Sequence, residues 1–97
     1  MPKFGLLARL EAKPGKESEV EAMLSGALAL AQAEAGTRTW YAFKLGPSTF
    51  GIFDTFDHDA GRQAHLNGEI AKALMANADA LLAKPPQIEP VDLLAVK

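Results

Sequence analysis

Residues 37–56 read TRTWYAFKLGPSTFGIFDTF, which is two runs of β-favouring residues on either side of a short break. Thr37 to Leu45 and Thr49 to Phe56 are both rich in aromatic and β-branched side chains, as strands are. The Gly46-Pro47-Ser48 segment between them has the residues that form tight turns. The stretch therefore predicts an antiparallel β-hairpin, and the elements on either side of it decide the rest of the fold.

The sequence before the hairpin predicts one strand and one helix. Lys3 to Ala12 is apolar on both alternating registers, which suits a strand covered on both faces. Pro14-Gly15 ends this strand, and the glutamates that follow favour a helix start, because a helix N-terminus attracts negative charge. Gly36 is typical of a helix end. The apolar stripe of the predicted helix consists of Val20, Met23, Leu24, Ala27, Leu28 and Ala31.

The sequence after the hairpin predicts a second helix and a last strand. Asp57 or Asp59 can cap this helix, and Asn67-Gly68 predicts a kink or a break inside it. Pro85-Pro86 ends the helix, because proline has no backbone N–H to continue it. Ile88 to Val96 supplies the last strand, and the proline inside it must lie at a sheet edge or at a bulge.

The order of the predicted elements is β-α-β-β-α-β, which defines an α+β fold of the ferredoxin-like type. We expect a single domain over residues 1–97, with a four-stranded antiparallel sheet and both helices on one of its faces. The other face would then expose apolar side chains such as Leu7, Trp40 and Phe53, or their opposite-register neighbours. A second copy packed sheet against sheet would cover this face, so we expect a homodimer.

The composition excludes several classes of function. Ten basic and twelve acidic residues give a net charge of -2 without a basic patch, so nucleic acid is not an expected partner. The absence of cysteine excludes disulfide scaffolds and thiolate sites. The N-terminus reaches Arg9 and Glu11 too soon for a signal peptide, and no apolar run approaches the roughly 20 residues of a membrane span. We expect a cytoplasmic protein without a membrane partner.

Three segments of the chain resemble the antibiotic biosynthesis monooxygenase family. They are Ala12 to Ala22 with its proline-glycine helix start, the aromatic-acidic Phe53-Asp54-Thr55-Phe56, and Ala60 to Leu66 with a histidine on the second helical segment. The resemblance implies a dimeric α+β barrel with a pocket between sheet and helices in each subunit. It also implies an activity found in some members, which oxygenate phenols, anthrones or quinols with molecular oxygen and without flavin, metal or haem.

Other relatives of that family degrade haem. The resemblance assigns that reaction to an asparagine on the first strand, a tryptophan after the third strand and a histidine on the second helix. His65 is the one match here, because the first predicted strand lacks asparagine and Trp40 belongs to the second. Haem binding or degradation is therefore the least favoured of the functions considered.

His65 is the predicted catalytic residue. An imidazole with an ordinary pKa of about 6.5 can accept a proton near neutrality, so we expect His65 to be the base that deprotonates the substrate. A capping or surface histidine is the structural alternative. Candidate substrate-binding residues supply aromatic surface, positive charge or an amide near the predicted pocket; they are Trp40, Tyr41, Phe43, Phe53, Arg62 and Asn67.

Each of these candidates also has a structural interpretation. The aromatic residues can be core, with at least one facing the helices and one the dimer interface. Arg62 can stabilise a phenolate or form a solvated ion pair, and Asn67 can orient a substrate oxygen or cap the helix. Asp54 is a second candidate base. We expect it instead to pair across strands with a cation, chosen among Arg9, Arg38 and Lys44.

No metal or organic cofactor is expected. His58 and His65 are about 10 Å apart along a helix, too far to share one ion, and the glycines form no phosphate-binding or dinucleotide-binding motif. We therefore expect a cofactor-independent monooxygenase of small aromatic compounds. The alternative is a non-catalytic dimeric module that binds a small molecule.

Overall fold

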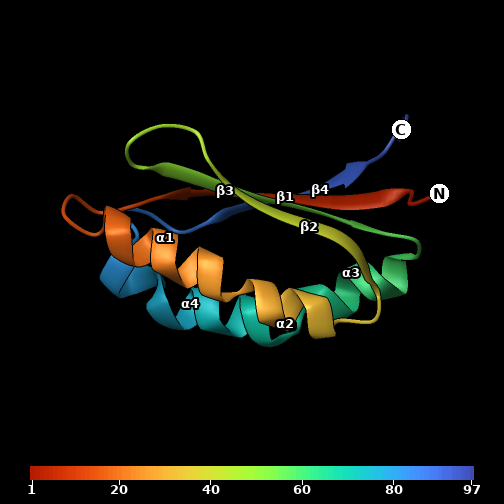
Figure 1. Ribbon diagram of the computed structural model, residues 1–97, viewed down its shortest axis with the longest axis horizontal. Coiled ribbons are helices and arrows are strands. Elements are labelled where there is room, and N and C mark those ends of the chain that lie inside the picture. The colour runs from red at the N-terminus through yellow and green to blue at the C-terminus, as the bar shows by residue number, and fades with distance from the viewer.

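The strands form one layer of the molecule and the helices form the other, so that all helices lie on the same side of the sheet (Figure 1). This computed structural model describes residues 1–97 and confirms the expected ferredoxin-like α+β fold, with an antiparallel sheet in the order β2-β3-β1-β4. The strands are β1 (Phe4–Glu11), β2 (Thr37–Lys44), β3 (Thr49–Phe56) and β4 (Gln87–Asp92). The helices are α1 (Glu17–Gly26), α2 (Leu28–Ala33), α3 (Asp59–Leu66) and α4 (Glu69–Leu81).

The predicted hairpin is formed by β2 and β3. Trp40 lies opposite Asp54 in this pair, and the register shifts once, between Thr37 and Thr39. Strand β1 lies between β3 and β4, so it has a neighbour on each side. Pro90 belongs to β4 at the edge of the sheet, where a missing N–H breaks no ladder on the outer side. The expected edge position of this proline is confirmed.

Both predicted helices are divided in two. The break at Asn67-Gly68 is the one expected from the sequence, and it separates α3 from α4. The break at Ala27, between α1 and α2, corrects the prediction of one continuous helix. The Ala27 amide donates to Met23 O at 3.1 Å and to Leu24 O at 3.2 Å, a bifurcated arrangement found where a helix tightens and ends. Gly26 has low helix propensity and favours the break at this point.

Helix α2 ends earlier than expected, at Ala33 instead of Gly36. Glu34 leaves the helix with an extended backbone, at ψ 107°. Its side chain therefore projects from a connecting segment rather than from a helix, toward α3. This boundary positions one of the charged groups described below.

Two further boundaries also differ from the prediction. The N-cap of α3 is His58, so neither Asp57 nor Asp59 caps the helix, although the Asp59 carboxylate lies in the first turn where the helix dipole favours it. The last strand ends at Asp92 rather than continuing to Val96. Strand β4 has only β1 as a neighbour, and Pro90 has no backbone N–H to donate. Few backbone hydrogen bonds are therefore available to extend the strand beyond Asp92.

The apolar core lies between the sheet and the helices. Leu10, Val20, Phe50 and Phe56 are at most 2% exposed there. Alternate residues of β1 and β3 point into this core, as the pleat of a strand requires. The longest helix, α4, has 13 residues, and no helix has the length and apolar character needed to cross a bilayer.

The helix-free face carries the alternate residues of the same strands. Tyr41 lies opposite Phe53, which in turn lies opposite Leu7, and Tyr41 is 57% exposed. The Phe43 ring lies so close over Gly51 that a Cβ atom there would be 2.3 Å from it. The face therefore carries an apolar patch, as expected, next to the exposed Arg9. It does not include Trp40, which points toward the helices.

Candidate functional site

His65 lies on the side of α3 that faces the sheet, and it is 8% exposed. Its Nε2 atom is 2.9 Å from Asp54 Oδ2, and its Nδ1 atom is 2.6 Å from Glu34 Oε1. The Phe56 ring packs beside the imidazole with a centroid distance of 5.5 Å. The sheet, α3 and the segment after α2 therefore each contribute one group to a buried cluster, Asp54–His65–Glu34.

Both ring nitrogens of His65 face a carboxylate oxygen, an arrangement that favours the imidazolium form, in which both nitrogens are N–H donors. Burial alone lowers the pKa of His65, but the hydrogen bonds to Asp54 and Glu34 outweigh burial and raise the pKa from 6.5 to about 9. The ring already carries its proton at neutral pH. This direction of the pKa disfavours His65 as the base at neutral pH, and the catalytic role of His65 stays a prediction.

Asp54 is 1% exposed and points from β3 toward the helices. Its Oδ2 atom accepts from His65, and its Oδ1 atom is buried without a hydrogen-bond partner. The expected pairing with a strand cation is wrong. Arg9 is exposed on the other face of the sheet, while Arg38 pairs with Asp57 at 3.1 Å and Lys44 with Glu21 at 3.9 Å.

Glu34 is the member of the cluster that sequence analysis missed. Its side chain is 20% exposed, and Oε1 also accepts a hydrogen bond from Thr37 Oγ1 at 2.6 Å. The connection after α2 lies directly against α3, where a Cβ atom on Gly61 would be 2.7 Å from Gly36 O. Glu34 and His65 are 31 positions apart, so no local pattern links them. The one sequence signal that the segment after α2 packs against α3 is the pair of glycines at this contact.

Two spaces meet at the cluster, and His65 is the residue that lines both. The inner cavity has a volume of about 30 Å³ between the sheet and the helices α3 and α4; eight of its ten lining residues are hydrophobic, and the others are Asp54 and His65. The outer cleft, of about 440 Å³, lies between the end of α2, α3 and the start of α4, and is lined by Glu34 and Glu69 as well as His65.

The predicted aromatic residues lie on opposite faces of the sheet. Trp40 faces the helices, packs against the core and is the strand neighbour of Asp54; its Nε1 atom is buried without a partner. Tyr41, Phe43 and Phe53 lie on the helix-free face, away from His65. Contact with substrate stays a prediction for all of them.

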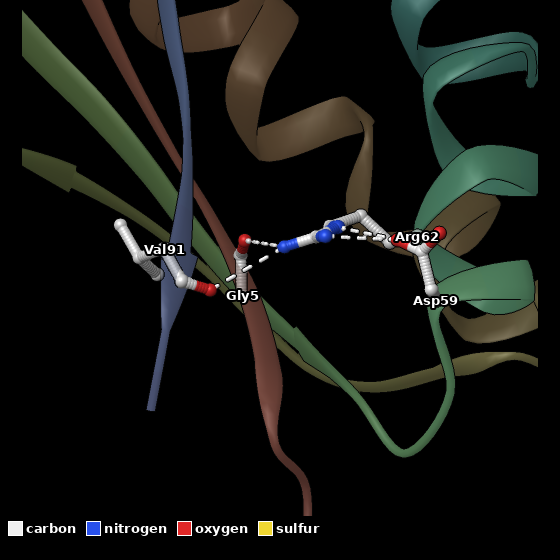
Figure 2. A network of polar contacts seen from close by, with 4 residues as sticks. All are labelled: Gly5, Asp59, Arg62 and Val91. Carbon is white, nitrogen blue, oxygen red and sulfur yellow. Dashed lines mark hydrogen bonds and ion pairs between the residues drawn. The ribbon is translucent and has the colours of Figure 1, made fainter. Parts of the chain in front are cut away.

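Arg62 bridges α3 and the sheet (Figure 2). Its Nη2 atom is 2.8 Å from the Asp59 carboxylate, and Nη1 is 3.4 Å from both Gly5 O and Val91 O. The guanidinium also lies over the Phe4 ring, 5.1 Å from its centroid. These contacts fit a structural role, and substrate binding by Arg62 stays a prediction.

Asn67 is exposed at the end of α3, where its Nδ2 atom donates to Gln63 O at 2.9 Å. This is the helix-capping interaction that was one of its two interpretations.

No three histidine, cysteine, aspartate or glutamate side chains come together in an arrangement that could hold a metal ion. Asp54 and His65 are the two titratable side chains that are buried.

The fold of this chain is that of solved proteins described as candidate antibiotic biosynthesis monooxygenases. One from Caulobacter crescentus CB15 has a TM-score of 0.82 at 20% identity, over 97% of this chain and 92% of that one. Another, from Nitrosomonas europaea, has a TM-score of 0.84 at 12% identity, over 95% of this chain and 99% of that one. The expected resemblance in fold is confirmed.

The chain belongs to the same family as the NE2512 protein of Nitrosomonas europaea, which is described as a protein of unknown function. The two are 62% identical with a TM-score of 0.98, over 100% of this chain and 94% of that one. No protein-family model and no curated protein matches the sequence.

Proposed function

We propose that the protein is a cytoplasmic, cofactor-independent monooxygenase that oxidises a small aromatic compound of the phenol, anthrone or quinol type with molecular oxygen. The observation that carries this proposal is the Asp54 Oδ1 atom, an unpaired carboxylate oxygen that is buried in an otherwise apolar cavity next to an imidazolium. Deprotonating a weakly acidic substrate in a site without water needs a base of this kind and a fixed positive charge. The shared fold with candidate monooxygenases supports the same reaction class.

The inner cavity, at about 30 Å³, has room for one or two water-sized groups, so only the acidic group of a substrate would enter it. Ile88, which lines it from the edge strand β4, is 40% exposed, and Leu66 and Ala71 are partly exposed. We propose that the acidic group of the substrate meets Asp54 inside, while the aromatic body lies over these three apolar side chains at the mouth.

The proposed reaction balances without a reductant. Asp54 takes the acidic proton, and the substrate anion passes one electron to oxygen before the two radicals join in a C–O bond. His65 stabilises the resulting peroxide anion, which is then protonated. Removal of the proton on the carbon that bears the peroxide then expels hydroxide, which leaves as water after protonation. The substrate supplies four electrons in all, so one oxygen atom ends in a carbonyl group and the other in water.

Oxygen uptake by metal-stripped protein, against a panel of quinols, anthrones and catechols, tests this proposal. Wild-type protein should consume oxygen with at least one compound, and Asp54→Asn should reduce the rate by about 100-fold or more. His58→Gln is the matched control, because His58 is an exposed N-cap outside the cluster. Circular dichroism establishes that each variant is folded.

Trp40 fluorescence separates catalysis from binding, since the single tryptophan is the strand neighbour of Asp54. Saturable quenching by an aromatic compound, without oxygen uptake by wild-type protein, would replace the monooxygenase with the non-catalytic binding module. A Soret band on titration with hemin would favour haem binding instead.

We also propose that two copies pair through the helix-free face. Tyr41, Phe43, Phe53 and Leu7 supply an apolar surface there, and Tyr41 is 57% exposed. Sheet-on-sheet packing would remove these side chains from water, and in a 97-residue chain this burial would add to a modest core.

A further inference from the structure

An apolar pocket, separate from the inner cavity, lies at the break between α1 and α2. It has a volume of about 140 Å³ and is enclosed by these two helices, by α4 and by Ile52 of the sheet. Eight of its nine lining residues are hydrophobic, and the ninth is Gly26. Gly26 and Leu30 are exposed, so this space, which we call the break pocket, opens to solvent beside the break.

Small side chains leave this space open. Gly26 and Ala27 lie at the break, and Ala73 faces the same space from α4. A Cβ atom on Gly26 would meet no atom within 4 Å. The break pocket therefore accompanies the division of the first predicted helix into α1 and α2.

The lining of the break pocket favours a ligand that needs no hydrogen bond. None of its nine residues has a polar side chain, whereas the inner cavity contains Asp54 and His65. A water molecule in a protein interior needs about two to four polar partners, and apolar cavities of about 150 Å³ stay dry and take up xenon or benzene. A small apolar molecule is thus the class of ligand that fits the break pocket.

The break pocket and the inner cavity are neighbours. Ile52, Ile70 and Leu74 line both spaces, so a layer of side chains separates them. Ile88 and Leu66, at the mouth of the inner cavity, do not line the break pocket. The break pocket therefore reaches the inner cavity from the side of α1 and α2, whereas the mouth reaches it from the side of β4 and α3.

We propose that the break pocket binds dioxygen and supplies it to the substrate across the side chains that the two spaces share. This inference rests on the proposed oxygenase function. An aromatic compound at the mouth closes that approach to the inner cavity, and dioxygen, which is small and apolar, enters from the other side. A change of rotamer at Ile70 or Leu74 opens the way for a diatomic molecule. The two substrates thus reach the site by separate paths.

Dioxygen itself is the probe, because it is paramagnetic and speeds the relaxation of nearby nuclei. Protein labelled with ¹³C at its alanine methyl groups is measured by NMR under oxygen and under nitrogen, without any aromatic compound. Ala27 lines the break pocket and is 9% exposed, and Ala12 is 5% exposed elsewhere in the core. Oxygen should raise the relaxation rate at Ala27 about threefold more than at Ala12. A polar gadolinium chelate, which reports exposure to solvent, should have a similar, small effect on both methyl groups.

Ala73→Leu places an isobutyl group in the break pocket and should reduce the oxygen effect at Ala27 to the level of Ala12. Ala76→Leu is the matched control, because it makes the same change at an exposed position of α4 that does not line the break pocket. Circular dichroism establishes that both variants are folded. Equal oxygen effects at Ala27 and Ala12 in wild-type protein would overturn the proposal, and so would an effect at Ala27 that persists in Ala73→Leu.

The kinetics of oxygen uptake test the supply of dioxygen to the reaction. Ala73→Leu should lower kcat/KM for oxygen by about threefold or more, and a higher oxygen pressure should restore the rate, whereas Ala76→Leu should keep the wild-type value. An unchanged kcat/KM for oxygen in Ala73→Leu would exclude this path. If wild-type protein consumes no oxygen with any compound, the monooxygenase function fails and the supply role fails with it, while the relaxation measurement still decides whether the break pocket binds a small apolar molecule.

Discussion

The two faces of the sheet are built by the same strands but have different coverings. On the face toward the helices, Phe50 and Ile52 are 2% and 5% exposed. On the other face, Tyr41 is 57% exposed and Phe53 is half-buried. Alternation along each strand therefore produces a closed core on one side and an open aromatic surface on the other.

The helix layer determines on which face of the sheet a charged side chain can be buried. Asp54 is 1% exposed on the helix side, where α3 brings His65 as its counter-ion. The next residue, Thr55, lies on the helix-free face. Its uncharged hydroxyl needs only a hydrogen-bond partner, which is the Thr39 hydroxyl at 2.6 Å. A buried carboxylate needs a paired cation, which only the helix layer supplies. The helices thus build the core and the charged site together.

Two phenylalanines on β3 test the difference between the faces most strongly. Phe50→Ala should lower the free energy of unfolding by about 3–5 kcal/mol, because its ring is enclosed by the core. Phe53→Ala should lower it by about 1 kcal/mol, because that ring stays partly exposed in a single subunit. Urea unfolding at low protein concentration measures both. Equal losses would mean that the two faces are equally buried.

The pH dependence of stability tests the charged site on the covered face. The folded-state pKa of His65, about 9, lies above the ordinary value of 6.5. Its contribution is therefore complete below pH 6.5 and is lost as the pH rises through 9, and the shift corresponds to about 3 kcal/mol. Urea unfolding between pH 6 and 9.5 should show this loss in wild-type protein and in His58→Gln, but not in His65→Gln. Parallel profiles for wild type and His65→Gln would contradict it.

The fold could be predicted because its signals are local. Gly46-Pro47-Ser48 and the runs beside it contain the chemistry of a hairpin, and Asn67-Gly68 contains that of a helix break. The break at Ala27 escaped prediction because the apolar stripe continues across it. A stripe records which side of a helix is buried, and two short helices lying on the same side of a sheet can share one.

The site was only partly predictable, because the packing of distant segments determines which charged side chains pair. His65 stood out by its chemistry, and Asp54 was considered but assigned to cations on neighbouring strands. The counter-ion came instead from a helix above the sheet. Glu34 gave no local signal, since its contact with His65 depends on α2 ending three residues before Gly36 and on the close packing of Gly36 against Gly61.

Association of two copies tests what covers the open face. Tyr41→Lys puts a charge at the centre of the aromatic surface and should weaken a dimer by roughly 2 kcal/mol, which is about 30-fold in its dissociation constant. Met75→Lys is the control, because Met75 is 60% exposed but lies on α4, in the opposite layer. Sedimentation velocity over a range of concentrations measures both. A monomeric wild type at micromolar concentration would refute the proposed pairing.

The smallest expected effect lies where α3 meets the edge of the sheet (Figure 2). Arg62→Met removes an ion pair with Asp59 in which the Arg62 side chain is 13% exposed, together with two long contacts to strand carbonyls. It should lower the free energy of unfolding by about 1 kcal/mol. Arg38→Met removes a similar pair with Asp57, but Arg38 is 59% exposed, so a loss of less than about 0.5 kcal/mol is expected. Urea unfolding of the two variants at the same salt concentration makes the comparison. If the two losses were equal, the covering of Arg62 by the sheet edge and the Phe4 ring would add nothing, and burial would not explain the stability of this ion pair.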